Sequence, residues 1–215
     1  MPGNMRLLIY AMQSSGASAF CYFLGQRAGS IAIVDVWSRE VAPRIQTSHP
    51  VVAKATVTMT RTAADHIASF RPDRTILFVR DPVSVYASLR NYDYGARFGS
   101  IEEKLIRFEH EFLQGCWDVV IRYEDFVARD PLVIEQINAL GWDCQPSYWQ
   151  LPRSRETIRD FNAANSAWCK NHFENGWGFG NIKQGPISPR SVARRDQPDL
   201  TKLVASVSPK LFSAY

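Results

Sequence analysis

The sequence predicts a single α/β domain in which a central parallel sheet is flanked by helices on both sides, giving three layers. Strand-like and helix-like segments alternate along residues 7–140, which is typical of a parallel sheet built from strand–helix–strand units. Two strand-like segments, 7–12 and 75–79, are apolar along nearly their whole length, as in strands buried on both faces. A chain of 215 residues easily buries one such core. We expect an α/β core over 1–142 and a loop-rich C-terminal lid over 143–215.

Local signals place the elements in chain order. Thr62 caps the start of a helix, Pro82 occupies a first helical turn, where its missing N–H costs nothing, and Gly141 ends a helix. After Asp143, aromatic, Gly and Pro residues mix, which predicts loops. Strands are expected over 7–12, 31–37, 50–58, 75–79 and 117–123. Helices are expected over 18–27, 62–70, 82–90, 101–114 and 131–140.

Composition limits the classes of function. Lys and Arg number 25 against 21 Asp and Glu, and the resulting net charge of +4 favours anionic ligands without indicating a nucleic-acid partner. The four cysteines are scattered and lack the spacing of metal ligands, so we expect reduced thiols and no metal site. The apolar run 7–12 is shorter than the roughly 7–15 residues of a signal peptide's hydrophobic region. No run reaches the roughly 18 apolar residues of a membrane span, so a cytoplasmic protein is expected.

A turn suited to a phosphate follows the first predicted strand. It reads Gln13-Ser14-Ser15-Gly16-Ala17-Ser18 and leads into a predicted helix. Gly16 permits close approach of the backbone, N–H groups at the start of a helix point at a ligand, and the serine hydroxyls add donors. The motif is not a nucleotide-kinase loop of the Walker A type, because no Lys follows Gly16. An ordinary strand-to-helix turn is the alternative interpretation.

A second such turn follows the strand 75–79. Arg80 comes directly after the apolar run, Asp81-Pro82 begins a helix, and Ser88 lies eight residues after Arg80. A guanidinium at the strand end and a hydroxyl two helical turns later can converge on one phosphate. The alternative is that Arg80 pairs with Asp81 or a helix end while Ser88 faces solvent.

Together, the two turns resemble those of the sulfotransferases that use 3′-phosphoadenosine-5′-phosphosulfate (PAPS). The family's first loop reads Lys or Arg, Ser, Gly, Thr, Thr or Ser, and Ser15, Gly16, Ala17 and Ser18 match its last four positions. Ser14 stands where the family has its cation. The resemblance covers residues 6–140 and implies the P-loop-like sulfotransferase fold. It also implies PAPS as donor and adenosine 3′,5′-bisphosphate (PAP) as product, with no metal.

By the same resemblance, Ser14, Ser15, Gly16, Ala17 and Ser18 would hold the 5′-phosphate of the nucleotide. Arg80 and Ser88 would hold the 3′-phosphate, since the family has Arg-[Asn/Asp]-Pro with a Ser eight residues after the Arg. The segment Tyr123-Glu124-Asp125 resembles an acidic pair of the family that ties a strand end to neighbouring loops.

Two further residues are expected to be catalytic. Lys54 resembles the Lys of the family's Lys-Thr-His strand, which contacts the transferring sulfuryl group, but Thr56 stands at the place of the catalytic His. Some branches of the family use a Glu about 20 residues after the loop Gly as general base instead. Asp35 lies 35 − 16 = 19 residues after Gly16 and is the favoured base, with Glu40 and His49 as alternatives.

The expected function is therefore transfer of a sulfuryl group to a hydroxyl or amine of a small molecule or glycan. A faint likeness of 178–183 to a late Gly-rich segment of the family leaves open which tail residues clasp the 3′-phosphate, the arginines 190, 194 and 195 among them. The alternatives are a kinase-like phosphoryl transferase and a non-catalytic relative that binds PAP or PAPS. The acceptor and the oligomeric state are left open by the sequence.

Overall fold

A computed structural model describes residues 5–34, 36, 39–92, 95–150 and 197–215. Its centre is a sheet of five strands, all parallel, in the order β2-β3-β1-β4-β5. This confirms the predicted parallel sheet. The strands are β1 (Arg6–Ala11), β2 (Ile31–Ile33), β3 (Val51–Thr56), β4 (Arg74–Val79) and β5 (Val119–Arg122).

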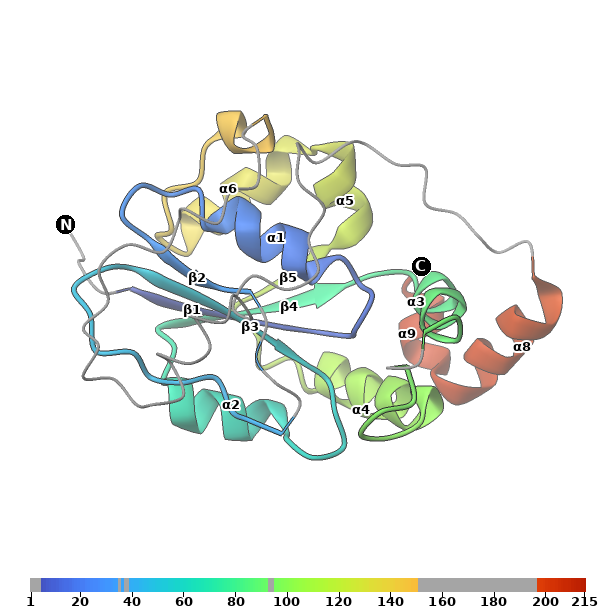
Figure 1. Cartoon of the computed structure of the whole chain (residues 1–215). Helices are drawn as coiled ribbons and strands as arrows, with labels where there is room; N and C mark the ends of the chain where they lie inside the picture. Colours follow the sequence, from blue (N-terminus) through green and yellow to red (C-terminus); the bar gives the residue numbers. More distant parts are fainter. Residues whose placement is uncertain (1–4, 35, 37–38, 93–94, 151–196) are drawn as a thin grey trace.

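Helices cover both faces of the sheet, as Figure 1 shows, so the predicted three layers are present. One face carries α1 (Ala17–Leu24), α5 (Tyr123–Ala128) and α6 (Pro131–Ala139), and the 3₁₀ turn η1 (Pro146–Trp149) packs against α1. The other face carries α2 (Ala63–Phe70), α3 (Pro82–Leu89) and α4 (Ile101–Gln114). Sequence analysis missed α5, because it treated Tyr123 as the end of a strand, whereas the helix begins there.

Short-range capping explains why these helices begin where the sequence predicted. Thr62 and Ser100 each accept a hydrogen bond from the backbone three residues later, at Asp65 and Glu103, and each of these carboxylates accepts one back from the cap's N–H. Such a reciprocal pair satisfies two of the N–H groups that a helix start leaves without partners.

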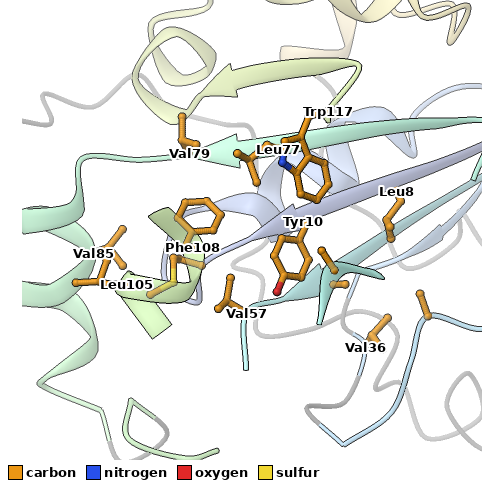
Figure 2. Close-up of a cluster of buried hydrophobic side chains, with 14 of the residues drawn as sticks. Leu8, Tyr10, Val36, Val57, Leu77, Val79, Val85, Leu105, Phe108 and Trp117 are labelled. Atoms are coloured by element: carbon orange, nitrogen blue, oxygen red, sulfur yellow. The ribbon is translucent and has the colours of Figure 1, made fainter. Parts of the chain in front are cut away.

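The side chains of β1 alternate between two hydrophobic clusters, one on each face of the sheet. Leu7, Ile9 and Ala11 belong to the cluster under α1 and α5. Leu8 and Tyr10 belong to the cluster under α2 and α4, which Figure 2 shows. Because successive strand residues point to opposite faces, a slip of one residue would move every one of these side chains to the wrong layer. Burial on both faces therefore sets the register of β1.

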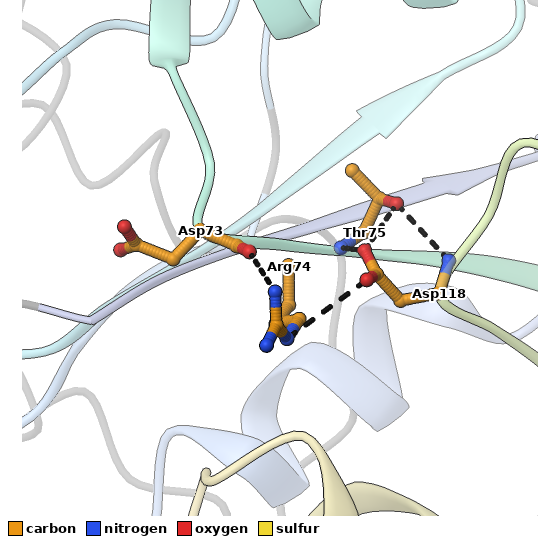
Figure 3. Close-up of polar contacts among 4 residues, drawn as sticks. All are labelled: Asp73, Arg74, Thr75 and Asp118. Atoms are coloured by element: carbon orange, nitrogen blue, oxygen red, sulfur yellow. Dashed lines mark hydrogen bonds and ion pairs between the residues drawn. The ribbon is translucent and has the colours of Figure 1, made fainter.

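A polar contact joins the amino ends of β4 and β5 (Figure 3). One carboxylate oxygen of Asp118 accepts hydrogen bonds from the Thr75 N–H at 2.7 Å and the Thr75 hydroxyl at 2.9 Å. Arg74 lies 3.8 Å from the other oxygen of the same carboxylate and is half exposed. Asp118 thus anchors the start of β5, the shorter of the two strands on that side of β1, to its neighbour β4.

The end of the chain forms two helices that the sequence analysis did not predict. They are α8 (Pro198–Val207) and α9 (Pro209–Ser213), and both pack against α3 and α4. Leu200, Val204 and Leu211 are buried there, and the Leu211 N–H donates to a Glu109 carboxylate oxygen at 2.7 Å. The expected loop-rich character of 143–215 therefore does not extend to this part. Among the described residues, no helix has the length and apolar character needed to cross a membrane.

Candidate functional site

The topology brings three strand ends together. β1 lies at the centre of the sheet between β3 and β4, so the turns that follow these three parallel strands meet at one edge. In open sheets of this kind, ligands bind outside the carboxyl ends of the strands. The first predicted phosphate turn follows β1, Lys54 is on β3, and Arg80 follows β4.

The first turn is shaped around Gly16. This residue caps α1 with a φ of 88°, in the left-handed region that favours glycine. A Cβ atom at this position would lie only 2.5 Å from Cε2 of the Tyr123 ring. Ser14 also has a positive φ, 59°, so the turn bends sharply before the helix begins. Gly16 is needed both for its backbone angle and for the close approach of Tyr123.

The turn leaves donors at the start of α1. Within the described residues, the N–H groups of Ala17 and Ser18 have no backbone acceptor, and the Ala17 N–H reaches the Ser15 hydroxyl at 3.4 Å. N–H groups without a backbone acceptor and the positive end of the helix dipole favour an anion at this position. The predicted use of Ser15, Gly16, Ala17 and Ser18 for a phosphate is compatible with this geometry and stays a prediction.

The second turn contacts the first through Arg80. Its guanidinium donates a hydrogen bond to the Ser14 carbonyl at 2.7 Å, across 66 residues of sequence. The guanidinium carbon lies 4.6 Å from the centroid of the Tyr123 ring, a cation–π contact. The Arg80 Nε is buried and has no hydrogen-bond partner among the described residues. Arg80 and Gly16 therefore both contact Tyr123, and the two predicted anion turns lie together.

The start of α3 is held by carboxylates rather than by Arg80. Asp81 caps the helix, since its side chain accepts hydrogen bonds from the Ser84 N–H and hydroxyl, and Pro82 follows at the first position. The Asp81 N–H donates in turn to Glu124 Oε1 at 3.1 Å. Burial raises the pKa of Glu124. Through this contact Glu124, the first residue of the acidic pair, ties the end of β5 to a neighbouring turn as predicted.

Ser88 lies in the last turn of α3 and is half buried. Its hydroxyl makes no hydrogen bond to any residue that the structure describes. It lies four positions after Ser84, so both serines share one side of the helix. The hydroxyl is thus available for a ligand, and its predicted contact with a 3′-phosphate stays a prediction.

Lys54 brings a positive charge to the first turn. It lies within β3, opposite Ile9 of β1, and is only 5% exposed. Its ammonium donates to the Ser18 hydroxyl at 2.9 Å. A lysine is seldom buried to this degree. The position beside Ser18 fits the predicted role of Lys54 at the transferring group, which no further observation tests.

The candidate bases differ in where they lie. Asp35, the favoured base, falls outside the described residues. Glu40 follows Arg39, whose carbonyl accepts a hydrogen bond from Arg61 in the loop after β3, so Glu40 belongs to the carboxyl edge of the sheet. His49 precedes β3, and its Nδ1 faces Gly29 in the loop before β2. His49 therefore lies at the amino edge, a strand's length from the two turns, which argues against it as the base.

Sequence analysis missed a buried lysine beside the first turn. Lys104 of α4 has no exposed surface, and its ammonium donates to Gln13 Oε1 at 3.0 Å, to the Gly95 carbonyl at 2.8 Å and to the Arg97 carbonyl at 2.6 Å. Burial lowers the pKa of Lys104 to about 8. The signal was present in the sequence, because Lys104 sits on the apolar side of its amphipathic helix together with Ile101, Leu105 and Phe108.

Lys104 holds Gln13, directly before the predicted phosphate turn, against the loop 95–97.

The tail candidates for the 3′-phosphate, including the three arginines at 190, 194 and 195, lie outside the described residues. Among the residues that the structure does describe, no group of three or more His, Cys, Asp or Glu side chains could hold a metal ion.

Comparisons with known proteins identify the fold. No family model and no curated protein sequence matches the chain. Among solved structures, mouse sulfotransferase SULT7A1 complexed with PAP matches with a TM-score of 0.51 and 11% identity, over 94% of this chain and 82% of that chain. Retinol dehydratase in a complex with retinol and PAP matches with a TM-score of 0.46 and 9% identity, over 98% of this chain and 82% of that chain. The likeness to the first confirms the predicted sulfotransferase fold.

Proposed function

We propose that the chain is a PAPS-dependent sulfotransferase, which moves a sulfuryl group from PAPS to a hydroxyl or amine of a small molecule or glycan. The observation that carries the proposal is the hydrogen bond from Arg80 to the Ser14 carbonyl, which joins two anion turns from different parts of the chain. PAPS carries phosphates at both ends of its ribose, and such a ligand suits two neighbouring turns. The fold supports the same conclusion, since mouse SULT7A1 of this fold was solved with PAP.

The donor would lie across the two turns. In this proposal, the helix N–H groups and the hydroxyls of Ser15 and Ser18 hold the 5′-phosphate, while Arg80 and Ser88 hold the 3′-phosphate. Arg80 keeps donors for this purpose, because a guanidinium has five N–H groups and the Ser14 carbonyl takes one. Its buried Nε, which lacks a partner among the described residues, is one of the remaining donors.

In the transfer step, the acceptor oxygen or nitrogen bonds to sulfur while the bond from sulfur to the 5′-phosphate oxygen breaks. Negative charge grows on that oxygen, and positive charge nearby stabilises it. Lys54, beside Ser18, supplies a cation from β3. This cation would compensate for the Lys or Arg of the family's first loop, whose place Ser14 takes in this chain. The proton of the acceptor passes to a base, for which Asp35 is the proposed residue and Glu40 the alternative.

Calorimetric titration with PAP tests the donor site. We expect Arg80→Ala to weaken PAP binding by about 1.5–3 kcal/mol, the scale of a hydrogen bond to a charged group. The matched control is Arg90→Ala, which also removes one positive charge. Arg90 lies at the far end of α3, where it is exposed and contacts Gln197. The control is expected to bind PAP as wild type does. Equal affinity of Arg80→Ala and wild type would contradict the proposal.

A second candidate is a non-catalytic relative that binds PAP or PAPS. Two departures from the family favour it, Ser14 in place of the loop cation and Thr56 in place of the catalytic His. A thermal-shift series with PAP, AMP and ATP with Mg²⁺, followed by a transfer assay over a panel of acceptors, separates the candidates, because a ligand that binds only the folded state raises the melting temperature. Stabilisation by PAP without any turnover selects this second candidate. Stabilisation by ATP with Mg²⁺ alone selects a kinase-like phosphoryl transferase.

A further inference from the structure

We propose that the acceptor is itself an anion, a hydroxyl or amine compound that carries a carboxylate or sulfate group. Its recognition site is an arginine cluster formed by Arg39, Arg61 and Arg107 at the carboxyl edge of β2 and β3. The inference rests on the proposed sulfotransferase function and adds the chemical class of the acceptor.

The three arginines are linked in a row by their own contacts. Arg107 donates to the Thr58 carbonyl at 2.5 Å and to the Arg61 carbonyl at 3.4 Å. Arg61 donates through its Nε to the Arg39 carbonyl at 3.1 Å. The Arg39 guanidinium lies 5.2 Å from the centroid of the Phe98 ring. The loops after β2 and β3 and the helix α4 thus each contribute one arginine to a row of guanidinium-to-carbonyl contacts at this edge.

These positive charges have no ion-pair partner among the described residues. Of the nearby acids, Asp65 and Glu103 each accept a hydrogen bond from the backbone of a helix cap, and neither makes an ion pair with these arginines within the described residues. The backbone and hydroxyl of Thr62 and, to a smaller degree, the charge of Arg61 lower the pKa of Asp65. Arg39 and Arg61 are exposed, so their guanidinium groups are open to an anionic ligand.

The arginine cluster adjoins the candidate active site on the side away from Arg80. The first turn follows β1, which has β4 and Arg80 on one side and β3 on the other. Lys54 lies on β3, four residues before Thr58, to which Arg107 donates. Lys104 connects the two regions, because it bonds both to Gln13 and to the carbonyl of Arg97, next to Phe98.

This arrangement gives the two substrates separate sides of β1. The nucleotide would use the β1 and β4 side, and the acceptor would approach Lys54 from the β3 side, past the cluster. A guanidinium binds a carboxylate or sulfate through two parallel hydrogen bonds, which fixes orientation as well as affinity. An acid group on the acceptor would therefore help to aim its hydroxyl or amine at the transferring group.

Two matched pairs of probe molecules test the proposal. Methyl β-D-glucuronide is compared with methyl β-D-glucoside, and 4-hydroxybenzoate with 4-hydroxybenzamide, so that each pair differs in one negative charge. Binding to the PAP-saturated protein is titrated by saturation-transfer NMR. We expect the anionic member of at least one pair to bind tenfold or more tightly than its neutral partner. Equal binding within both pairs overturns the proposal.

A double variant locates the effect. Arg39→Gln with Arg61→Gln removes two exposed charges of the cluster and is expected to abolish the preference for the anionic probe. The matched control, Arg71→Gln with Arg74→Gln, removes two exposed charges at the amino edge of β4, where Figure 3 shows Arg74, and is expected to keep the preference. An equal loss in both double variants would show an effect of net charge and would overturn the proposed site.

Titration of the same proteins with PAP separates this inference from the proposed function. Unchanged PAP affinity in Arg39→Gln/Arg61→Gln demonstrates that the variant is folded and that its donor site is intact. PAP binding without any anion preference overturns the inference and leaves the proposed function standing. If the protein does not bind PAP, the probes are titrated without PAP, and an anion preference that depends on the cluster then supports the anion site and rejects the proposed function.

Discussion

Replacement of Gly16 by alanine tests how the two anion turns are held together. The added Cβ atom would meet the Tyr123 ring at 2.5 Å, and the residue would keep a φ of 88°. A left-handed backbone costs an L-residue about 1–2 kcal/mol, and one extra methyl group in a filled space costs about 1–3 kcal/mol. The expected loss of stability is therefore about 2–5 kcal/mol, a large part of the roughly 5–15 kcal/mol of a typical domain.

Urea unfolding, followed by circular dichroism, measures this loss. Gly115→Ala is the matched control, because Gly115 has a φ of 61° and no heavy atom lies within 4 Å of its added Cβ in the described structure. It carries the backbone cost without the collision. The difference between the two variants is thus the cost of the contact with Tyr123. If Gly16→Ala is no less stable than Gly115→Ala, the close packing of the first turn against Tyr123 is refuted.

A double-mutant cycle extends the same experiment to the binding site. Tyr123→Ala should remove the collision, so that Gly16→Ala costs less in its presence than in wild type. We also expect Gly16→Ala to weaken PAP binding, because a displaced Tyr123 ring disturbs its 4.6 Å contact with Arg80. Unchanged PAP affinity in a destabilised Gly16→Ala protein would separate folding of the turn from its proposed role.

Three further outcomes are expected. Wild type should gain stability relative to Lys104→Met as the pH rises from 8 to 10.5. The pKa of Lys104 is about 8 in the native state against an ordinary value of 10.5, so the native state binds fewer protons there than the unfolded state, and the gain reaches up to about 3 kcal/mol. A constant difference between the two proteins across this pH range, measured by urea unfolding, would contradict this. Asp118→Ala should lose about 2 kcal/mol in the same assay, since two hydrogen bonds from Thr75 lose their acceptor. Asp118→Asn should lose much less, because both bonds end on one carboxylate oxygen, whose place the amide oxygen can take. Lys54→Met should lower kcat by about 10²–10³-fold in a transfer assay and change PAP affinity less, because charge on the leaving oxygen grows only as the bond breaks. An equal loss of kcat and of PAP affinity would show that Lys54 acts in ground-state binding.

The candidate site was predictable where its signals are local. Arg80-Asp81-Pro82 after an apolar strand and Gly16 before a helix were recognised from neighbouring residues alone, and the structure has both turns where they were expected. The contact between Arg80 and Ser14 was not predictable, because it depends on β1 and β4 being neighbours in the sheet. The spacing of the two motifs along the chain does not indicate the order of the strands in the sheet.

Other features were missed because their causes lie far away in the chain. Tyr123 lies against Gly16 across more than 100 residues, and α8 and α9 hold their place through buried contacts with α3 and α4. The surroundings of Lys104 were likewise not predictable from neighbouring residues. Its position on an apolar helix face was visible, yet the three acceptors that stabilise its charge come from two loops brought together by the fold.

By itself, the sequence determined the strands, most helices and the two turns that point toward an anion, since apolar periodicity, caps and turn residues act within a few positions along the chain. The tertiary structure alone decided that both turns meet at Tyr123, that Lys54 and Lys104 lie beside the first turn, and that three arginines share one edge. The physical reason is that these contacts join residues from separate strands and helices, and their proximity arises only when the sheet buries its two faces.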